Sequence, residues 1–236
     1  TRKESSAASD VYKRQPYLLA YFLQTLYGMA DLFIIGQFEG VASTTAVSVG
    51  SQVMHMFTVV IVGLAMGATV NIGQAIGARD KKRAAVDMGN TATLFMVLSV
   101  ILTVVLYFCV NGIVGFMSVP EEAAAGTAMY LKICFLGIPF ITAYNIISSI
   151  FRGMGDSKSP MYFIAIACGV NIVLDYIFMG VLHLGPSGAA LGTTLSQTVS
   201  VIVALTMFIR GKTGITVKKG NFKPRKETMR RLLKIG

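Results

Sequence analysis

The sequence predicts an all-α integral membrane protein with six transmembrane helices. Of its 236 residues, 54% are hydrophobic and only 14% are charged, whereas a soluble domain carries about 25% charged residues. Its apolar runs reach the roughly 20 residues that a helix needs to cross a bilayer. The runs are continuous and do not alternate in polarity, which favours helices over the short strands of a membrane barrel.

The six expected spans follow one another with short polar connections. They cover residues 16–38, 43–76, 88–117, 127–151, 160–183 and 187–209. The second and third exceed the minimum length, so we expect them to tilt or to extend beyond the lipid. Gly137 and Pro139 fall inside the fourth span and predict a kink there.

The chain is expected to divide into three parts. Residues 1–15 are polar and have no apolar signal-peptide core, so we expect a truncated or foreign leader that is not part of the fold. Residues 16–210 form the six-helix lobe. Residues 211–236 are predicted to be a basic cytoplasmic linker toward a second lobe that is missing from this chain, and their last residues resemble the start of another element.

Positive charge gathers in segments that six spans would place on one side of the membrane. Of 21 Lys and Arg, four precede Pro16, four lie in 77–86, two in 152–160 and ten in 210–236, which leaves Lys132. The connections on the other side contain Glu39, Glu121 and Glu122 and no Lys or Arg. The positive-inside rule therefore predicts a protein of the inner (plasma) membrane with both termini in the cytoplasm.

A protein with a net charge of +10 could bind either nucleic acid or anionic membrane lipid. Because the charge lies beside the ends of the spans, lipid headgroups account for it and no nucleic acid is expected.

Three charged side chains fall inside the expected spans, namely Asp31, Lys132 and Asp175. Lys132 is near a helix end, where its long stem can carry the ammonium group to the interface. An aspartate at the centre of a span costs roughly 2.5–3.5 kcal/mol, so each must face a cavity or a partner.

The two aspartates are expected at the same depth. Asp31 lies fifteen residues after Pro16, and Asp175 lies fifteen residues after Pro160. Both spans run in the same direction, so each carboxylate is roughly 22 Å from the start of its helix.

Other polar side chains are expected at this level. Asn171 precedes Asp175 by one helical turn, Tyr27 precedes Asp31 by one turn, and Thr193 and Tyr130 come from the sixth and fourth spans. Carboxylate, amide and hydroxyl oxygens suit a hard cation such as Na⁺, and two close carboxylates can share a proton. The alternative is that these groups only bond neighbouring helices.

The remaining motifs indicate packing. Gly63, Gly67, Gly73 and Gly77 have the spacing of close helix contacts, and Cys109, Cys134 and Cys168 lack metal-ligand spacing. The sequence contains no Walker A, HExxH or GxSxG motif. We therefore expect neither an enzyme nor a cofactor other than a coupling ion.

Four segments resemble the multidrug and toxic compound extrusion (MATE) transporters. They are LYGMADLFIIGQFEGVASTTAVSV (26–49), NIGQAIGARDKKRA (71–84), IFRGMGDSKSP (150–160) and GPSGAALGTTLSQ (185–197). Together with NIVLDYIF (171–178) they are spread along nearly all of residues 16–210.

The resemblance implies half of a transporter with two six-helix lobes around a central cavity, in which this chain is the N-terminal lobe. Such transporters export organic cations and amphipathic compounds in exchange for Na⁺ or H⁺. In the DinF-like branch the cation site of this lobe would fall on Asp31, Asn171, Asp175 and Thr193, with Tyr130 nearby. Tyr27 and Asn145 are candidates for lining the substrate cavity.

Two other functions are compatible with the sequence. A lipid-linked oligosaccharide flippase of the related superfamily would need several cations in its cavity, and only Lys132 is available. A membrane subunit without transport activity would place Asp31 and Asp175 apart, each bonded to its own helix neighbours.

Overall fold

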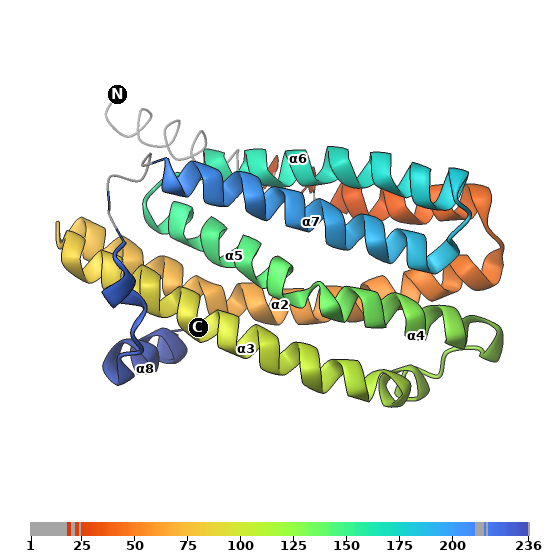
Figure 1. Ribbon diagram of the computed structural model, residues 1–236, viewed down its shortest axis with the longest axis horizontal. Helices are drawn as coiled ribbons and strands as arrows, with labels where there is room; N and C mark the ends of the chain where they lie inside the picture. The colour runs from red at the N-terminus through yellow and green to blue at the C-terminus, as the bar shows by residue number, and fades with distance from the viewer. Residues whose placement is uncertain (1–17, 20–21, 24, 211–214, 216, 236) are drawn as a thin grey trace, which may run out of the picture.

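The protein, in a computed structural model, is a bundle of long helices (Figure 1). The structure describes residues 18–19, 22–23, 25–210, 215 and 217–235, so the expected leader at 1–15 lies outside the described residues. The first helix is described without a break over 25–38. It is followed by α2 (Val41–Gly77), α3 (Lys81–Phe116), α4 (Glu121–Leu136), α5 (Ile138–Gly153), α6 (Lys158–Asp175), a π-helical turn η1 (Tyr176–Val181), α7 (Gly185–Ile209), a 3₁₀ turn η2 (Lys219–Phe222) and α8 (Lys226–Ile235).

The prediction of an all-α membrane fold is confirmed. The described residues contain no strand. Four of their helices are long and apolar enough to cross a membrane, and α4 with α5 makes a fifth when the bent pair is counted as one span. The first expected span, 16–38, is described only in part. Large apolar side chains such as Phe108 and Phe116 are exposed on α3, as expected of a surface in contact with lipid.

The predicted kink in the fourth span is present, and its cause is visible. The helix breaks at Gly137, and α4 and α5 meet there at an angle of 49°. Pro139 has no N–H, so it cannot bond the carbonyl of Phe135 four residues earlier. The hydroxyl of Thr103 in α3 donates to that carbonyl at 3.1 Å. A neighbouring helix thus replaces the hydrogen bond that the proline removes.

The connections alternate between the two ends of the bundle (Figure 1). The turns after α2 and α5 and the C-terminal end of α7 lie at one end, and the turns after the first helix, α3 and η1 lie at the other. The first end holds the basic segments at 77–86 and 152–160, together with Arg210 and the described basic residues of 217–235. The separation of charge that the sequence predicted is therefore present in the fold.

At the basic end, two aspartates accept hydrogen bonds from backbone amides where helices begin. Asp80 caps α3 by accepting a hydrogen bond from the backbone N–H of Arg83 at 2.9 Å. Asp156 accepts from the backbone N–H groups of Lys158 and Ser159 at 3.1 and 3.0 Å before α6 begins. Both carboxylates satisfy amides that a helix start leaves without partners.

The segment predicted as a linker is folded against the bundle where the structure describes it. Asn90 of α3 donates to the carbonyl of Asn221 at 3.0 Å and accepts from the N–H of Arg225 at 2.6 Å. The hydroxyl of Thr93 donates to the carbonyl of Phe222 at 2.8 Å. Gly89 lets this chain approach, because a Cβ at that position would overlap the backbone of Asn221. The residues that contact the linker are thus on one face of α3.

An ion pair joins α8 to α3 in the same region. The fully buried carboxylate of Asp87 accepts from Arg231 of α8 at 2.9 Å and lies 3.7 Å from Arg83. Asp87 is the seventh residue of α3, so Asp80, and not Asp87, occupies the start of that helix. Leu232 is buried on the same side of α8, while Lys226 and Arg230 are exposed. The helix is therefore amphipathic and docked by both apolar and charged contacts.

Replacing Asp87 with Asn is expected to loosen α8, because Arg231 would lose its carboxylate partner. A hydrogen bond between charged groups contributes about 1.5–3 kcal/mol, and the partial exposure of Arg231 places the effect near the lower value. Limited trypsin digestion of the purified chain in detergent should cut the linker faster than in the wild type. Glu227→Gln, which removes an exposed carboxylate from α8, is the control. Equal digestion rates for the two variants would contradict this role of the ion pair.

Candidate functional site

Two acidic side chains from different helices are buried together inside the bundle. Asp31 lies in the first helix and Asp175 is the last residue of α6. Their exposed fractions are 3% and 0%, and Asn171, one turn before Asp175, is also 0% exposed. The helix geometry that places Asn171 and Asp175 on one face also directs both toward the first helix.

The two carboxylates lie next to each other. The side chains of Asp175, Asn171 and Thr193 of α7 are the polar neighbours of the Asp31 carboxylate. The hydroxyl of Thr193 donates to Oδ2 of Asp31 at 3.4 Å. Three segments of the chain thus bring their polar groups to one point, at the common depth that the sequence predicted.

Most of the oxygens at this point have no hydrogen-bond donor. Oδ1 of Asp31, both carboxylate oxygens of Asp175 and both amide atoms of Asn171 are buried without a partner among the described residues. Burying an uncompensated charge is costly. Two carboxylates side by side can bond each other only when one of them carries a proton, and otherwise they require a cation. The arrangement therefore has the chemistry of a site for a proton or a small cation.

A close approach of α7 shapes the site. Gly192 lies directly against the carboxylate of Asp175, and a Cβ there would overlap Oδ1. Gly137, at the break between α4 and α5, also lies close to Thr194, with 2.8 Å between an added Cβ and the Thr194 methyl group. Glycines at both contacts allow α7 to carry Thr193 to Asp31.

The helix changes its winding immediately after Asp175. Residues Tyr176–Val181 form a π-helical turn, in which Leu182 N–H donates to the carbonyl of Ile177 at 2.9 Å. Such turns occur mostly as single irregularities and often at functional sites. Here the wider turn begins at the residue after the buried carboxylate.

The other predicted residues occupy different positions relative to this pair. Tyr130 of α4 is 2% exposed, and it lies near Asp31 and Tyr27. Tyr27 in turn lies beside Thr193. Asn145 is buried in α5, where its amide donates to the carbonyl of Ile141 at 2.8 Å. Tyr130 and Tyr27 therefore belong to the surroundings of the acidic pair, and Asn145 is bonded within its own helix.

Two glycines at the site escaped the sequence analysis. Gly192 contacts Asp175, and Gly50 of α2 contacts the ring of Tyr130, where a Cβ would overlap the ring. Glycine has no side-chain functional group, so the sequence carried no signal that these two positions contact the site. The described residues contain no group of three or more His, Cys, Asp or Glu side chains placed to hold a metal ion, so the acidic pair and its neutral neighbours are the candidate site.

Replacing Gly192 with Ala is expected to displace the Asp175 side chain. Overpacking of a buried contact typically costs about 1–3 kcal/mol, which should lower the thermal unfolding midpoint of the chain in detergent, measured by circular dichroism. Gly169→Ala in α6 is the control, because a Cβ at Gly169 has no neighbour within 4 Å. If both variants unfolded at the same temperature, the close approach of α7 to Asp175 would be wrong.

Comparison with known proteins places the chain in a family. The MatE family model matches residues 16–177. The chain is 31% identical over 218 residues to "Probable multidrug resistance protein NorM" of Thermotoga maritima, covering 91% of this chain and 47% of the relative. It is 30% identical over 199 residues to "Probable multidrug resistance protein YoeA" of Bacillus subtilis, covering 83% of this chain and 43% of the relative.

A solved structure extends the similarity to three dimensions. "Outward-facing conformation of a multidrug resistance MATE family transporter of the MOP superfamily" matches with a TM-score of 0.86 and 29% identity, covering 92% of this chain and 48% of that one. The chain therefore spans about half the length of its relatives, in agreement with one six-helix lobe of a two-lobe transporter. These names describe resistance proteins and a transporter, not enzymes, and the apolar helices make the chain a multi-pass membrane protein. The chain belongs to the MatE family, the multidrug and toxic compound extrusion transporters that its sequence motifs resemble.

Proposed function

We propose that this chain is the N-terminal lobe of a secondary antiporter that exports organic cations or other amphipathic compounds in exchange for Na⁺ or H⁺. It would act in the inner (plasma) membrane together with a second six-helix lobe, with its basic end in the cytoplasm. The relatives that are named multidrug resistance proteins support export of drugs. The coupling ion and the transported compound go beyond those names.

One observation carries the coupling proposal. Asp31 and Asp175 lie side by side in the bundle, and three of their four carboxylate oxygens are buried without a donor. A Na⁺ bound there would be held by the two carboxylates, by the amide oxygen of Asn171 and by the hydroxyl of Thr193. A proton would need only the two carboxylates.

The ion can drive transport only if it binds two conformations with different affinity. The site joins the first helix to α6 and α7, so binding draws the three segments together and removal of the ion lets the carboxylates repel each other. We infer that this change repacks the first helix and alters the cavity that faces the second lobe. Transport would then follow from rocking of the two lobes around the substrate.

The two rival functions have less support. A flippase cavity would require several cations at membrane depth. Within the described helices from 88 to 209, Lys132 is the one Lys or Arg that lies away from the basic end, and it is half-buried. A purely structural role would leave each aspartate satisfied by its own helix, whereas three of their four carboxylate oxygens are buried without a donor.

Loss of either carboxylate should abolish coupled export. In the protein that carries both lobes, Asp31→Asn and Asp175→Asn are expected to stop ethidium efflux driven by an imposed Na⁺ or H⁺ gradient, because neither amide can hold the charge of the ion. Efflux is measured by ethidium fluorescence in cells that express the protein, with each gradient imposed in turn. Glu122→Gln, an exposed carboxylate at the start of α4, should transport like the wild type. Undiminished efflux in both aspartate variants would contradict the proposal.

The neutral ligands distinguish the two ions. Thr193→Val removes an oxygen that only Na⁺ would need, so with Na⁺ as the driving ion the concentration for half-maximal efflux should rise several-fold while the maximal rate changes little. With H⁺ as the driving ion the same variant should keep its dependence on the pH gradient. The measurement is efflux rate against Na⁺ concentration at fixed pH, with Thr206→Val, a substitution outside the site, as the matched control. A variant that loses both responses would show that Thr193 acts by packing alone.

A further inference from the structure

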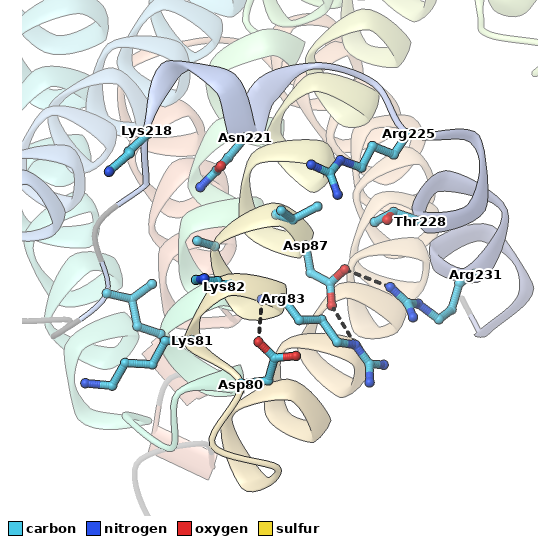
Figure 2. A pocket seen from close by; sticks show the side chains of 13 residues that line it. Asp80, Lys81, Lys82, Arg83, Asp87, Lys218, Asn221, Arg225, Thr228 and Arg231 are labelled. Atoms are coloured by element: carbon cyan, nitrogen blue, oxygen red, sulfur yellow. Dashed lines mark hydrogen bonds and ion pairs between the residues drawn. The ribbon is translucent and has the colours of Figure 1, made fainter.

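Basic side chains gather in a second place, at the basic end of the bundle and separate from the acidic pair. A hollow of about 820 Å³ opens there between the first turns of α3 and the segment from η2 to α8 (Figure 2). Six basic side chains line it, namely Lys81, Lys82, Arg83, Lys218, Arg225 and Arg231. Only two carboxylates, Asp80 and Asp87, are among its lining residues.

Both carboxylates are already engaged. Asp80 accepts from the backbone of Arg83 at the start of α3, and Asp87 is paired with Arg231 and Arg83. Figure 2 shows these interactions as dashed lines below the linker. Lys81, Lys82, Lys218 and Arg225 form no ion pair with any described residue. The hollow thus carries positive charge that the described part of the chain does not neutralise.

This charge is held in place by the fold. Lys81 and Lys82 begin α3, whereas Lys218 and Arg225 come from a segment more than 130 residues later. Asn90 fixes that segment by bonding Asn221 and Arg225, and Thr93 fixes Phe222. The four cations repel one another, and the hydrogen bonds of Asn90 and Thr93 hold them together in spite of this repulsion. A bound anion would stabilise the same arrangement.

The position of the hollow identifies the class of anion. It lies at the end of α3 where the charged first turns give way, after Asp87, to the uncharged remainder of the helix, and a helix that crosses a bilayer meets the lipid headgroups at such a boundary. Phe222 is 44% exposed beside it, so an apolar side chain stands next to the basic groups. Basic pockets at this level of a membrane protein suit phosphate headgroups, and each Lys or Arg near the surface contributes about fivefold in affinity.

We propose that this hollow binds the phosphate of an anionic phospholipid headgroup, with Lys81, Lys82, Lys218 and Arg225 as its ligands. The site is separate from the acidic pair and does not depend on which ion or compound the transporter moves. Binding would join the linker to α3 and to the membrane surface, and so stabilise the docked position of α8.

The test compares two fourfold variants of equal charge. The site variant is Lys81→Gln, Lys82→Gln, Lys218→Gln and Arg225→Gln. The control variant is Lys219→Gln, Lys223→Gln, Lys226→Gln and Arg230→Gln, four exposed cations of the same segment that do not line the hollow. Binding of fluorescent phosphatidylglycerol to the full chain in neutral detergent is measured by anisotropy, with fluorescent phosphatidylcholine as the neutral lipid. Circular dichroism and gel filtration establish that all three proteins are folded.

The proposal expects wild type and control variant to bind phosphatidylglycerol with similar affinity and to discriminate against phosphatidylcholine. The site variant should bind at least about tenfold more weakly. Equal loss in both variants, or no loss in either, would overturn the site. Full displacement of the lipid by millimolar inorganic phosphate or pyrophosphate would overturn the headgroup as its occupant and assign the hollow to a soluble phosphate compound.

Discussion

The buried contact between Asp31 and Asp175 is the constraint on which the rest of the bundle depends. Two carboxylates cannot remain charged and side by side in a low-dielectric interior unless something positive lies between them. Their position requires the first helix, α6 and α7 to meet at one depth, and it requires glycine at 192 because any larger residue would fill the space of the carboxylate. The π-helical turn after Asp175 and the break at Gly137 are the irregularities that accompany this meeting point. Elsewhere the described helices are continuous, as expected of helices in lipid, where each backbone N–H and C=O must be hydrogen-bonded within its own helix.

Polar groups in this lobe are arranged in two separate systems with opposite charge. The acidic pair lies within the bundle among oxygens that lack donors, whereas the basic hollow lies at the end where the charged connections gather. The hydrogen bonds of the linker to Asn90 and Thr93 belong to the second system only. A change at one site can therefore be examined without direct disturbance of the other, because no described ion pair or hydrogen bond connects them.

Asp87 illustrates how a carboxylate near a helix start can serve a role other than capping. A carboxylate in that position is favoured by the helix dipole. In the folded chain Asp80 caps the start of α3, and Asp87 instead forms an ion pair with Arg231 from the far end of the sequence. Local rules describe the helix start, but they contain no information about a cation 144 residues away.

The sequence by itself determined the membrane class, the helical spans, the kink at Gly137 and Pro139, and the separation of charge between the two ends, because hydrophobic length, missing N–H groups and charge position are properties of local sequence. It also placed Asp31 and Asp175 at equal depth, since the helical rise is constant. Only the tertiary structure decided that these carboxylates face each other, that Gly192 and Gly50 make room for Asp175 and Tyr130, and that Asn145 bonds its own helix. It also decided that the linker folds back onto α3. Depth along a helix follows from counting residues, but the direction in which a side chain points depends on how each helix is rotated against its neighbours, and that is set by packing over the whole bundle.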